Sequence, residues 1–140
     1  MNQKRTKPAF ELTMQVRDYE CDLQGIVNNA VYQHYIEHTR SEFMKSEGVS
    51  FSRLHEQGID TVVARLAMEF KSPLRPDDTF LSCLSVEKQG IRYVFHQDLY
   101  RLPDHRHALH ADVTIVCLIA GRPRDCELIN SVFAKYFFRL

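Results

Sequence analysis

The stretch RDYECDLQGIVNNAVY, residues 17–32, carries the information that decides the fold. Asp22 lies in a polar segment, Gly25 follows three residues later, and a helix is predicted to begin near Asn28 or Asn29, either of which is a good N-cap. A helix start presents backbone N–H groups without acceptors and the positive end of the helix dipole. It can hold a developing oxyanion, and a nearby carboxylate can attack a carbonyl or activate water. Hydrolytic acyl transfer needs at least these two groups.

The segments on either side of this stretch follow the hydrophobic periods of strands and helices. Residues 10–17 alternate apolar and polar side chains and predict a strand. After Asn29, apolar side chains recur at helical spacing as far as Phe43, and Gly48 is placed to end that helix. The remaining elements are predicted as a helical turn at 51–57, strands at 64–71, 80–88, 91–101 and 108–119, and a terminal helix at 128–137.

Short turns join the four later strands, which favours antiparallel pairing among them. One sheet and one long apolar-faced helix predict an α+β domain in which the sheet packs over the helix. No internal repeat or linker interrupts the chain, so residues 1–140 are expected to form a single domain. The run 103–110 carries three histidines and is predicted as a solvated loop between strands.

Composition excludes several classes of function. Eighteen Lys and Arg balance eighteen Asp and Glu, so nothing draws the chain to nucleic acid or to an anionic membrane. The amino-terminal MNQKRTKPAFEL has no apolar run, so no secretory signal is expected, and no stretch reaches the length of a membrane span. Four cysteines without a CxxC pair suggest neither a zinc ribbon nor a disulfide framework. A soluble, cytoplasmic protein is expected.

The motif D-x-x-G-x-V-x-x-x-x-Y, formed here by Asp22, Gly25, Val27 and Tyr32, resembles the signature of the 4-hydroxybenzoyl-CoA thioesterase family of hotdog proteins. The fuller quoted stretch more closely resembles plant acyl thioesterases of the methylketone-synthase type. The resemblance implies a hotdog fold, a curved antiparallel five-stranded sheet around one long helix, here with a C-terminal helix added. It also implies a thioesterase that acts on acyl-CoA or acyl carrier protein without a cofactor, as a homodimer or homotetramer.

The resemblance implies a role for particular positions. Asp22 matches the catalytic aspartate, which acts as nucleophile or as general base towards water. The backbone N–H of Asn29 matches the donor that polarises the thioester carbonyl. Many bacterial relatives place a histidine at this position, so a histidine-assisted mechanism is not expected here, whereas a backbone donor survives the change. In a related branch the carboxylate comes from the helix instead, at the position of Glu37.

Binding residues are assigned from the same resemblance. Coenzyme A and phosphopantetheine carry phosphate, so basic side chains are expected near the mouth of the site. Lys88 and Arg92 flank a strand turn where the family often binds coenzyme A, and Arg65, Lys71 and Arg75 are the alternatives. The motif and an apolar pocket beside the helix are expected to supply the remaining contacts, from Gly25, Val27, Tyr32, Tyr35 and Phe43.

Two other functions remain open from the residues alone. His34, Glu37 and His38 spell H-x-x-E-H, the pattern of inverted zinc peptidases, in which two histidines one turn apart bind the metal. A third ligand would be required, and Glu127 on the terminal helix is the candidate. The other alternative is a hotdog module that binds acyl thioesters without cleaving them. Metal-free hydrolysis is the preferred hypothesis.

Overall fold

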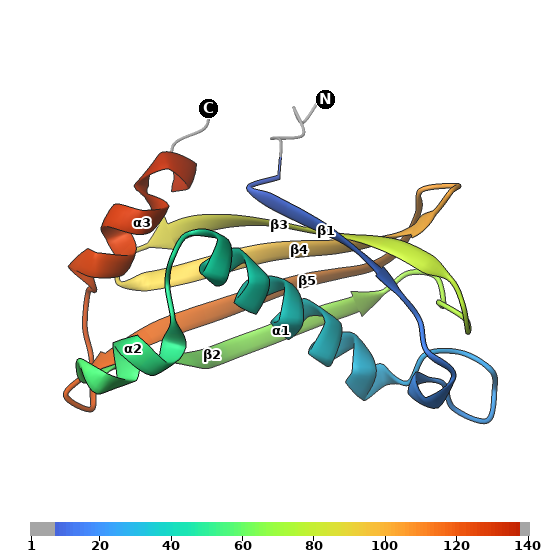
Figure 1. The fold of residues 1–140 in the computed structure, drawn as a ribbon, viewed down its shortest axis with the longest axis horizontal. Coiled ribbons are helices and arrows are strands. Elements are labelled where there is room, and N and C mark those ends of the chain that lie inside the picture. The colour runs from blue at the N-terminus through green and yellow to red at the C-terminus, as the bar shows by residue number, and fades with distance from the viewer. Residues whose placement is uncertain (1–7, 138–140) are drawn as a thin grey trace.

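The computed structural model describes residues 8–137, in which an antiparallel sheet curls around a long central helix (Figure 1). The α+β class and the hotdog arrangement predicted from sequence are confirmed. Residues 1–7, which include most of the basic amino terminus, lie outside this range. The strands are β1 (Phe10–Gln15), β2 (Ile59–Phe70), β3 (Thr79–Gln89), β4 (Arg92–Leu102), β5 (Arg106–Ile119) and the short β6 (Arg122–Pro123), and the helices are α1 (Asn29–Ser46), α2 (Phe51–Glu56) and α3 (Glu127–Phe137).

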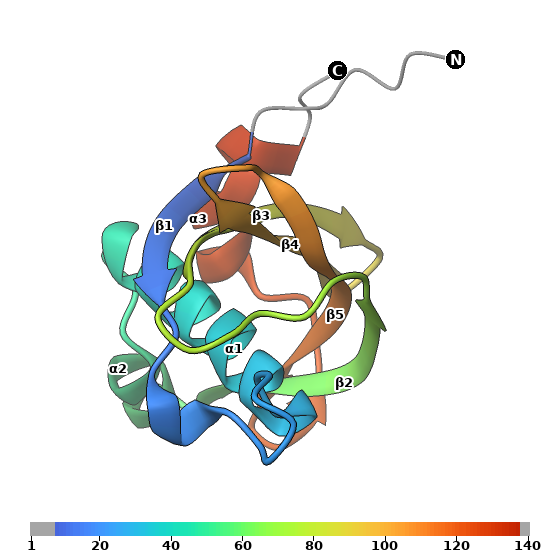
Figure 2. The same cartoon turned by 90° about the vertical axis from the view of Figure 1, so that its right-hand side faces the viewer.

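The strands lie in the order β1-β3-β4-β5-β2, and β6, which was not predicted, pairs with the end of β5. Antiparallel pairing among the four later strands is therefore confirmed, although β2 pairs with β5 and not with β3, which follows it in the sequence. The segment 71–78 between β2 and β3 crosses the open end of the curled sheet (Figure 2). It does so because Leu74 is buried at the start of α1. The Leu74 carbonyl accepts from the Val27 N–H at 2.9 Å, and the Leu74 N–H donates to the Tyr32 hydroxyl at 3.0 Å.

The strand β2 begins at Ile59, five residues before the predicted start at residue 64. Its register against β5 shifts between Val63 and Arg65. A β-bulge of this kind breaks the alternation of side chains, so residues before and after it do not share one period-two pattern. Only the second half of the strand was therefore visible in the sequence.

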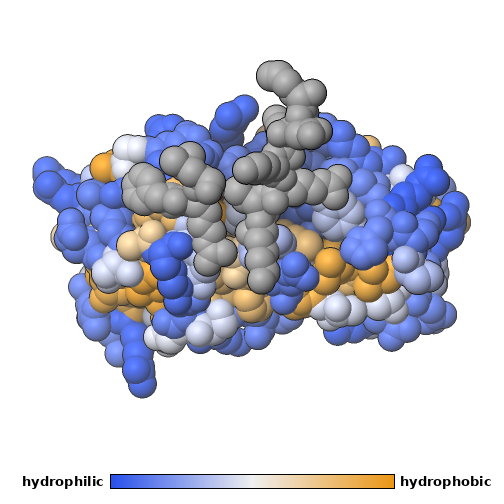
Figure 3. Space-filling view, turned by 90° about the horizontal axis from the view of Figure 1, so that it is seen from above, coloured by the Kyte–Doolittle hydropathy of each residue, from blue (hydrophilic) through white to orange (hydrophobic). Residues whose placement is uncertain are grey.

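The core lies between the sheet and α1, and α3 closes one end of it (Figure 1). On β5 the predicted inner face is buried at Leu109, Ala111, Val113 and Cys117, whereas Ile115 is only partly buried. On α3, Ile129 and Phe133 are buried as predicted, but Leu128 is exposed, so the apolar stripe of this helix is narrower than its sequence suggests. The face of the molecule drawn in Figure 3 is mainly hydrophilic, with hydrophobic residues in a band that runs across the lower half of the view. Among residues 8–137 no helix has both the length and the apolar character needed to cross a bilayer.

Of the histidine-rich run 103–110, only residues 103–105 form the predicted connection between strands. The strand β5 begins at Arg106, because pairing with β4 continues past Leu99 through a second register shift. His107 and His110 consequently lie on the strand, and both contact the carboxylate of Asp98, at 2.8 and 2.9 Å. These contacts belong to the polar outer face of the sheet.

Candidate active site

Residues 21–27 form a small loop whose two ends pair with each other. Cys21 and Val27 form an antiparallel bridge, and the Asp22 N–H donates to the carbonyl of Ile26 at 2.9 Å. Val27 is buried and begins the approach to α1. The loop therefore holds Asp22 next to the residues that start the helix.

The carboxylate of Asp22 is held from within the loop. Its Oδ1 accepts from the backbone N–H of Gln24 at 3.0 Å. Gly25 turns the chain at a φ of 76°, in the left-handed region that favours glycine, and its N–H donates to the Asp22 carbonyl at 3.0 Å. Asp22 remains partly exposed, so its carboxylate can reach a ligand. Gly25 thus acts through the shape of the loop and not through a side chain.

The start of α1 leaves one backbone donor open beside this loop. Asn28 is the N-cap: its Oδ1 accepts from the Ala30 N–H at 3.0 Å and its carbonyl accepts from the Val31 N–H at 2.9 Å. Of the first three N–H groups of α1, only that of Asn29 has no acceptor among residues 8–137. An exposed donor at the positive end of an 18-residue helix suits a developing oxyanion.

Glu20, which the sequence patterns did not single out, fixes the loop to the helix. Only 9% of it is exposed, and its Oε1 accepts from the Arg17 N–H at 2.7 Å and from the Tyr35 hydroxyl at 2.8 Å. Its carbonyl accepts from the Asn28 N–H at 3.0 Å. Burial and then the contact with Glu20 raise the pKa of Tyr35, so its hydroxyl stays a donor. Burial alone distinguishes Glu20 from the neighbouring acidic residues, and burial is not readable from spacing.

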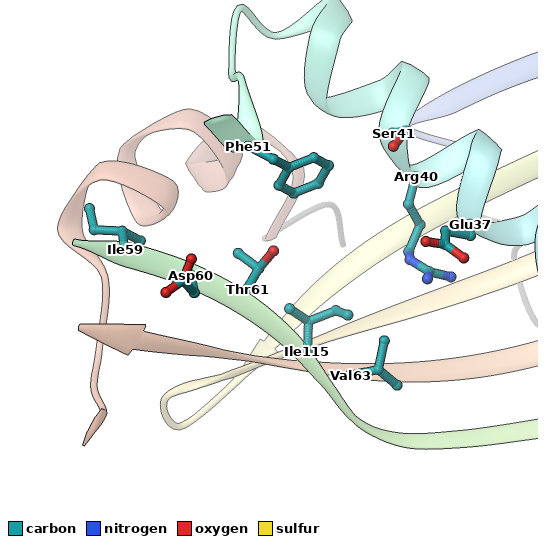
Figure 4. A pocket seen from close by; sticks show the side chains of 9 residues that line it. All are labelled: Glu37, Arg40, Ser41, Phe51, Ile59, Asp60, Thr61, Val63 and Ile115. Carbon is teal, nitrogen blue, oxygen red and sulfur yellow. The ribbon is translucent and has the colours of Figure 1, made fainter. Parts of the chain in front are cut away.

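Glu37 lies apart from Asp22 in this chain. It follows Asn29 by eight residues, about 12 Å along the helix at a rise of 1.5 Å per residue. Its side chain lines a cavity of about 310 Å³ between α1 and β2, next to Arg40 (Figure 4). Asp22 does not line this cavity. The two candidate carboxylates therefore do not converge within one chain.

Lys88 and Arg92 are also remote from Asp22. Gln15, just before the Asp22 segment, pairs with Thr79 at the start of β3. Lys88 is nine residues further along β3 than Thr79, so the two residues are about 30 Å apart at roughly 3.3 Å per residue. Its Nζ forms an ion pair with Asp125 Oδ1 at 2.7 Å. A role for these two cations at the Asp22 site would therefore require a second chain.

The aromatic side chains expected to line an acyl pocket mostly fill the core. Tyr32, Tyr35 and Phe43 are 3%, 4% and 0% exposed. The Tyr32 hydroxyl holds the crossing segment through Leu74, and Phe43 stacks on Phe133 with ring centroids 5.3 Å apart. Tyr35 also lines a groove of about 490 Å³ between α1 and β1, whereas Tyr32 and Phe43 serve the core.

The H-x-x-E-H pattern is divided between two faces of α1. His34 and His38 border a groove between α1 and β1, whereas Glu37 faces the cavity beside β2. Glu127 is the first residue of α3, and α3 lies near the C-terminal end of α1 (Figure 1). Within the range 8–137 no group of three or more His, Cys, Asp or Glu side chains is arranged to hold a metal ion. The geometry gives no support to the zinc alternative.

Comparison with known proteins identifies relatives. The family model described as thioesterase superfamily matches residues 24–106, a range that begins after Asp22. A chloroplastic acyl-acyl carrier protein thioesterase of Arabidopsis thaliana is 33% identical over 127 residues, which cover 90% of this chain and 66% of that protein. A second chloroplastic acyl-acyl carrier protein thioesterase of Arabidopsis thaliana is 36% identical over 109 residues, which cover 77% of this chain and 58% of that protein. The chain thus spans less than two thirds of these two proteins. An acyl-CoA thioester hydrolase of Escherichia coli is 25% identical and covers 91% and 95%.

Solved structures share the fold. The 1,4-dihydroxy-2-naphthoyl-CoA thioesterase from Synechocystis superposes with a TM-score of 0.84 at 15% identity and covers 89% of this chain and 95% of that one. A protein from Aquifex aeolicus gives a TM-score of 0.81 at 26% identity, with coverage of 88% and 98%. At 15% identity, the likeness to the Synechocystis thioesterase shows only the shared fold, a curled sheet around a helix.

Proposed function

This chain belongs to the thioesterase superfamily, and from that membership we propose that it hydrolyses acyl thioesters with Asp22 as its catalytic carboxylate. One observation carries the proposal: the partly exposed carboxylate of Asp22 and the N–H of Asn29, which has no acceptor within residues 8–137, lie on the same short loop and helix start. Relatives are named for acyl carrier protein and for coenzyme A, so both carriers are candidate substrates.

In the proposed reaction the thioester oxygen accepts from the Asn29 N–H, and the helix start stabilises the oxyanion that forms. Asp22 acts by one of two routes. As a base, it takes a proton from the water that forms the new C–O bond; the C–S bond breaks, and the proton passes to the thiolate. As a nucleophile, it forms an acyl anhydride and expels the thiolate, which takes a proton from water; the hydroxide that remains adds to the anhydride and releases the carboxylic acid and the Asp22 carboxylate. Both routes give one carboxylic acid and one thiol.

We also propose that two copies associate through β2. This strand is an edge of the sheet, twelve residues long, and an unpaired edge of this length invites pairing with another chain. Its apolar side chains Val62, Val63 and Phe70 are 39%, 50% and 51% exposed. The cavity beside Glu37 opens along the same strand, so a second chain there would add to its wall.

Thiol release from a panel of acyl-CoAs and acyl carrier proteins tests the catalytic role of Asp22. Asp22→Asn keeps an acceptor for the Gln24 N–H but removes the base or nucleophile, and kcat should fall about 10²-fold or more. Asp18→Asn, an exposed carboxylate just before the loop, is the matched control and should retain activity. Activity that survives in folded Asp22→Asn would move the catalytic role to Glu37. Bound acyl ligand without cleavage by the parent protein would favour the non-catalytic module.

A further inference from the structure

Two buried cysteines at the α3 end of the molecule take no part in the proposed reaction. Cys117 lies near the end of β5, and Cys126 is the residue immediately before α3. Their exposed fractions are 0% and 1%. The chain between them turns back through β6, where Leu118 pairs with Pro123 and the Arg124 N–H donates to the Cys117 carbonyl at 3.0 Å. The turn thereby brings the two cysteines to the same part of the core.

The two thiols meet at this point. A hydrogen bond joins the side chains of Cys117 and Cys126, and burial, then the charge of Cys126 and this hydrogen bond, raise the pKa of Cys117 to about 12. Tyr93 of β4 lies beside both: its hydroxyl donates to the Cys126 carbonyl at 3.3 Å, and after burial the two thiols raise its pKa. The other two cysteines lie elsewhere, Cys21 in the active-site loop and Cys83 in the middle of β3.

We propose that Cys117 and Cys126 are a redox-active pair that closes to an intramolecular disulfide and fastens the start of α3 to β5. The oxidant is a hydroperoxide, of which hydrogen peroxide is the simplest. One sulfur, as thiolate, attacks the peroxide; an S–O bond forms, the O–O bond breaks, and the hydroxide that leaves takes up the proton of the thiol. The second sulfur attacks the resulting sulfenic acid; the S–S bond forms, the S–O bond breaks, and water leaves. The two thiols are oxidised to one disulfide, and one hydrogen peroxide is reduced to two waters.

Burial determines how fast this reaction runs. A buried thiol with a raised pKa reacts slowly, because little of it is thiolate and the oxidant does not reach it. Reaction therefore requires the segment before α3 to open. Cys126 moves with that segment, whereas Cys117 stays in β5, paired with Thr61 of β2. The pair should consequently respond to sustained exposure to peroxide and not to a brief one.

An ion pair near the surface holds this segment closed. Asp125 Oδ1 accepts from Lys88 Nζ of β3 at 2.7 Å and from Asn130 Nδ2 of α3 at 3.0 Å. The Lys88 and Asp125 side chains are 24% and 42% exposed, so loss of their ion pair should raise the open fraction about two- to fivefold. The charge of Asp125 also raises the pKa of Cys117, so its removal acts in the same direction. Asp125→Asn should therefore be oxidised faster than the parent.

The disulfide would close the loop 117–126 and stabilise the protein chiefly by restricting the unfolded chain. For a loop and a domain of these sizes, the oxidised protein should melt about 8 °C above the reduced one. Ile129 and Phe133 of α3 are buried in the core, so the start of α3 is part of the main packing unit. The rise should therefore appear in the melting of the whole domain.

Peroxide treatment followed by alkylation and peptide mass spectrometry tests the pair directly. In the Cys21→Ser/Cys83→Ala variant, Cys117 and Cys126 are the only cysteines left. We expect a disulfide between the two peptides that carry them, reversed by dithiothreitol together with the rise in Tm. The same pair of peptides should be linked in the parent, so the result does not depend on how well the double variant folds.

The rate of oxidation tests the opening step. Asp125→Asn should form the disulfide about two- to fivefold faster than the parent. Asp104→Asn, which removes an exposed ion pair with Arg101 at the far end of β4, is the matched control and should be oxidised at the parent rate. Equal rates in Asp125→Asn and the parent would contradict the opening step.

Three results would overturn the pairing itself. One is oxidation of Cys117 and Cys126 to separate sulfenic or sulfinic acids without a disulfide. Another is a disulfide in the parent that joins Cys21 or Cys83 in place of either. The third is a pair that stays reduced, even in Asp125→Asn, under peroxide that fully oxidises the partly exposed Cys21. None of these measurements requires thioester cleavage, so the inference is tested independently of the proposed function.

Discussion

Removal of one buried hydroxyl should disturb the active-site loop without touching any reacting atom. Tyr35→Phe deletes the donor that reaches Glu20 Oε1 at 2.8 Å and keeps the ring in the core. Tyr35 is 4% exposed and Glu20 is 9% exposed, so water cannot readily replace the lost donor. Glu20 also accepts from the Arg17 N–H, and its carbonyl accepts from the Asn28 N–H. The anchor between the loop and the start of α1 is therefore weakened at its buried end.

The size of the effect follows from the charge on the acceptor. A hydrogen bond to a buried carboxylate contributes about 1.5–3 kcal/mol. A domain of this size loses roughly 3 °C of Tm for each kcal/mol, so Tyr35→Phe should melt about 5–9 °C below the parent. A displacement of the Asp22 loop well under 1 Å should lower kcat roughly tenfold with little change in KM, since a 1 Å misplacement costs about 10²-fold.

Two comparisons separate positioning from a general loss of stability. Thr39→Val, one turn further along α1, deletes the hydroxyl that lies 2.6 Å from Ser82 Oγ in the core; it should lower Tm but leave kcat unchanged. A double-mutant cycle of Tyr35→Phe with Glu20→Gln should give a coupling of about 1 kcal/mol or more for groups in direct contact. Additive effects, or a parent-like kcat in Tyr35→Phe, would refute the role given to Glu20.

The outer face and the edge of the sheet give two further tests. His96 lies 2.6 Å from Asp112 and 2.9 Å from Glu87; burial lowers its pKa, but these two contacts outweigh burial and raise it. The contacts of protonated His96 therefore stabilise the folded state fully below a pH of about 6.5. This stabilisation is lost as the pH rises through the folded-state pKa of His96. Urea unfolding between about pH 6 and pH 9 should show this decline in the parent and a smaller decline in His96→Asn, in which His110 still contacts Asp98 and Asp112 and keeps a raised pKa. At the edge, Val63→Lys should convert a dimer to a monomer in sedimentation velocity, and an unchanged mass would count against the β2 interface.

The elements that could be predicted from sequence are those in which the local spacing of apolar residues shows which side of the element is buried. The inner face of β5 needed only alternation, and Asn28 needed only its place before an apolar helix. The position of β2 in the sheet was not predictable in this way. Its connection to β3 contains prolines and aspartates and has the composition of a turn, yet Leu74 within it is fully buried. One apolar residue in a polar turn was the only trace of the crossing.

The same distinction divides the candidate site. Asp22 and Asn29 are separated by one loop, so their spacing in the sequence already implied that they lie together. Glu20 and Tyr35 are fifteen residues apart, and nothing in either residue type indicates that they meet. Lys88 was placed near the site by resemblance, but the register of β3 puts it at the other end of the sheet. Contacts that depend on the path of the chain were the ones missed.

Cavities are the hardest feature to read from sequence, because they are the space left after packing. Phe43 and Met44 are adjacent, apolar and buried on the same helix. The ring of Phe43 is surrounded by other rings, with Phe10 at 5.8 Å and Phe133 at 5.3 Å, so it fills the core. Met44 lines a small apolar cavity of about 40 Å³ beneath α3 instead. Helical periodicity treats both residues alike, since it records which face is buried and not whether the facing element reaches it. A pocket beside α1 could therefore be expected from sequence, but the lining of the small apolar cavity depended on where α3 packs.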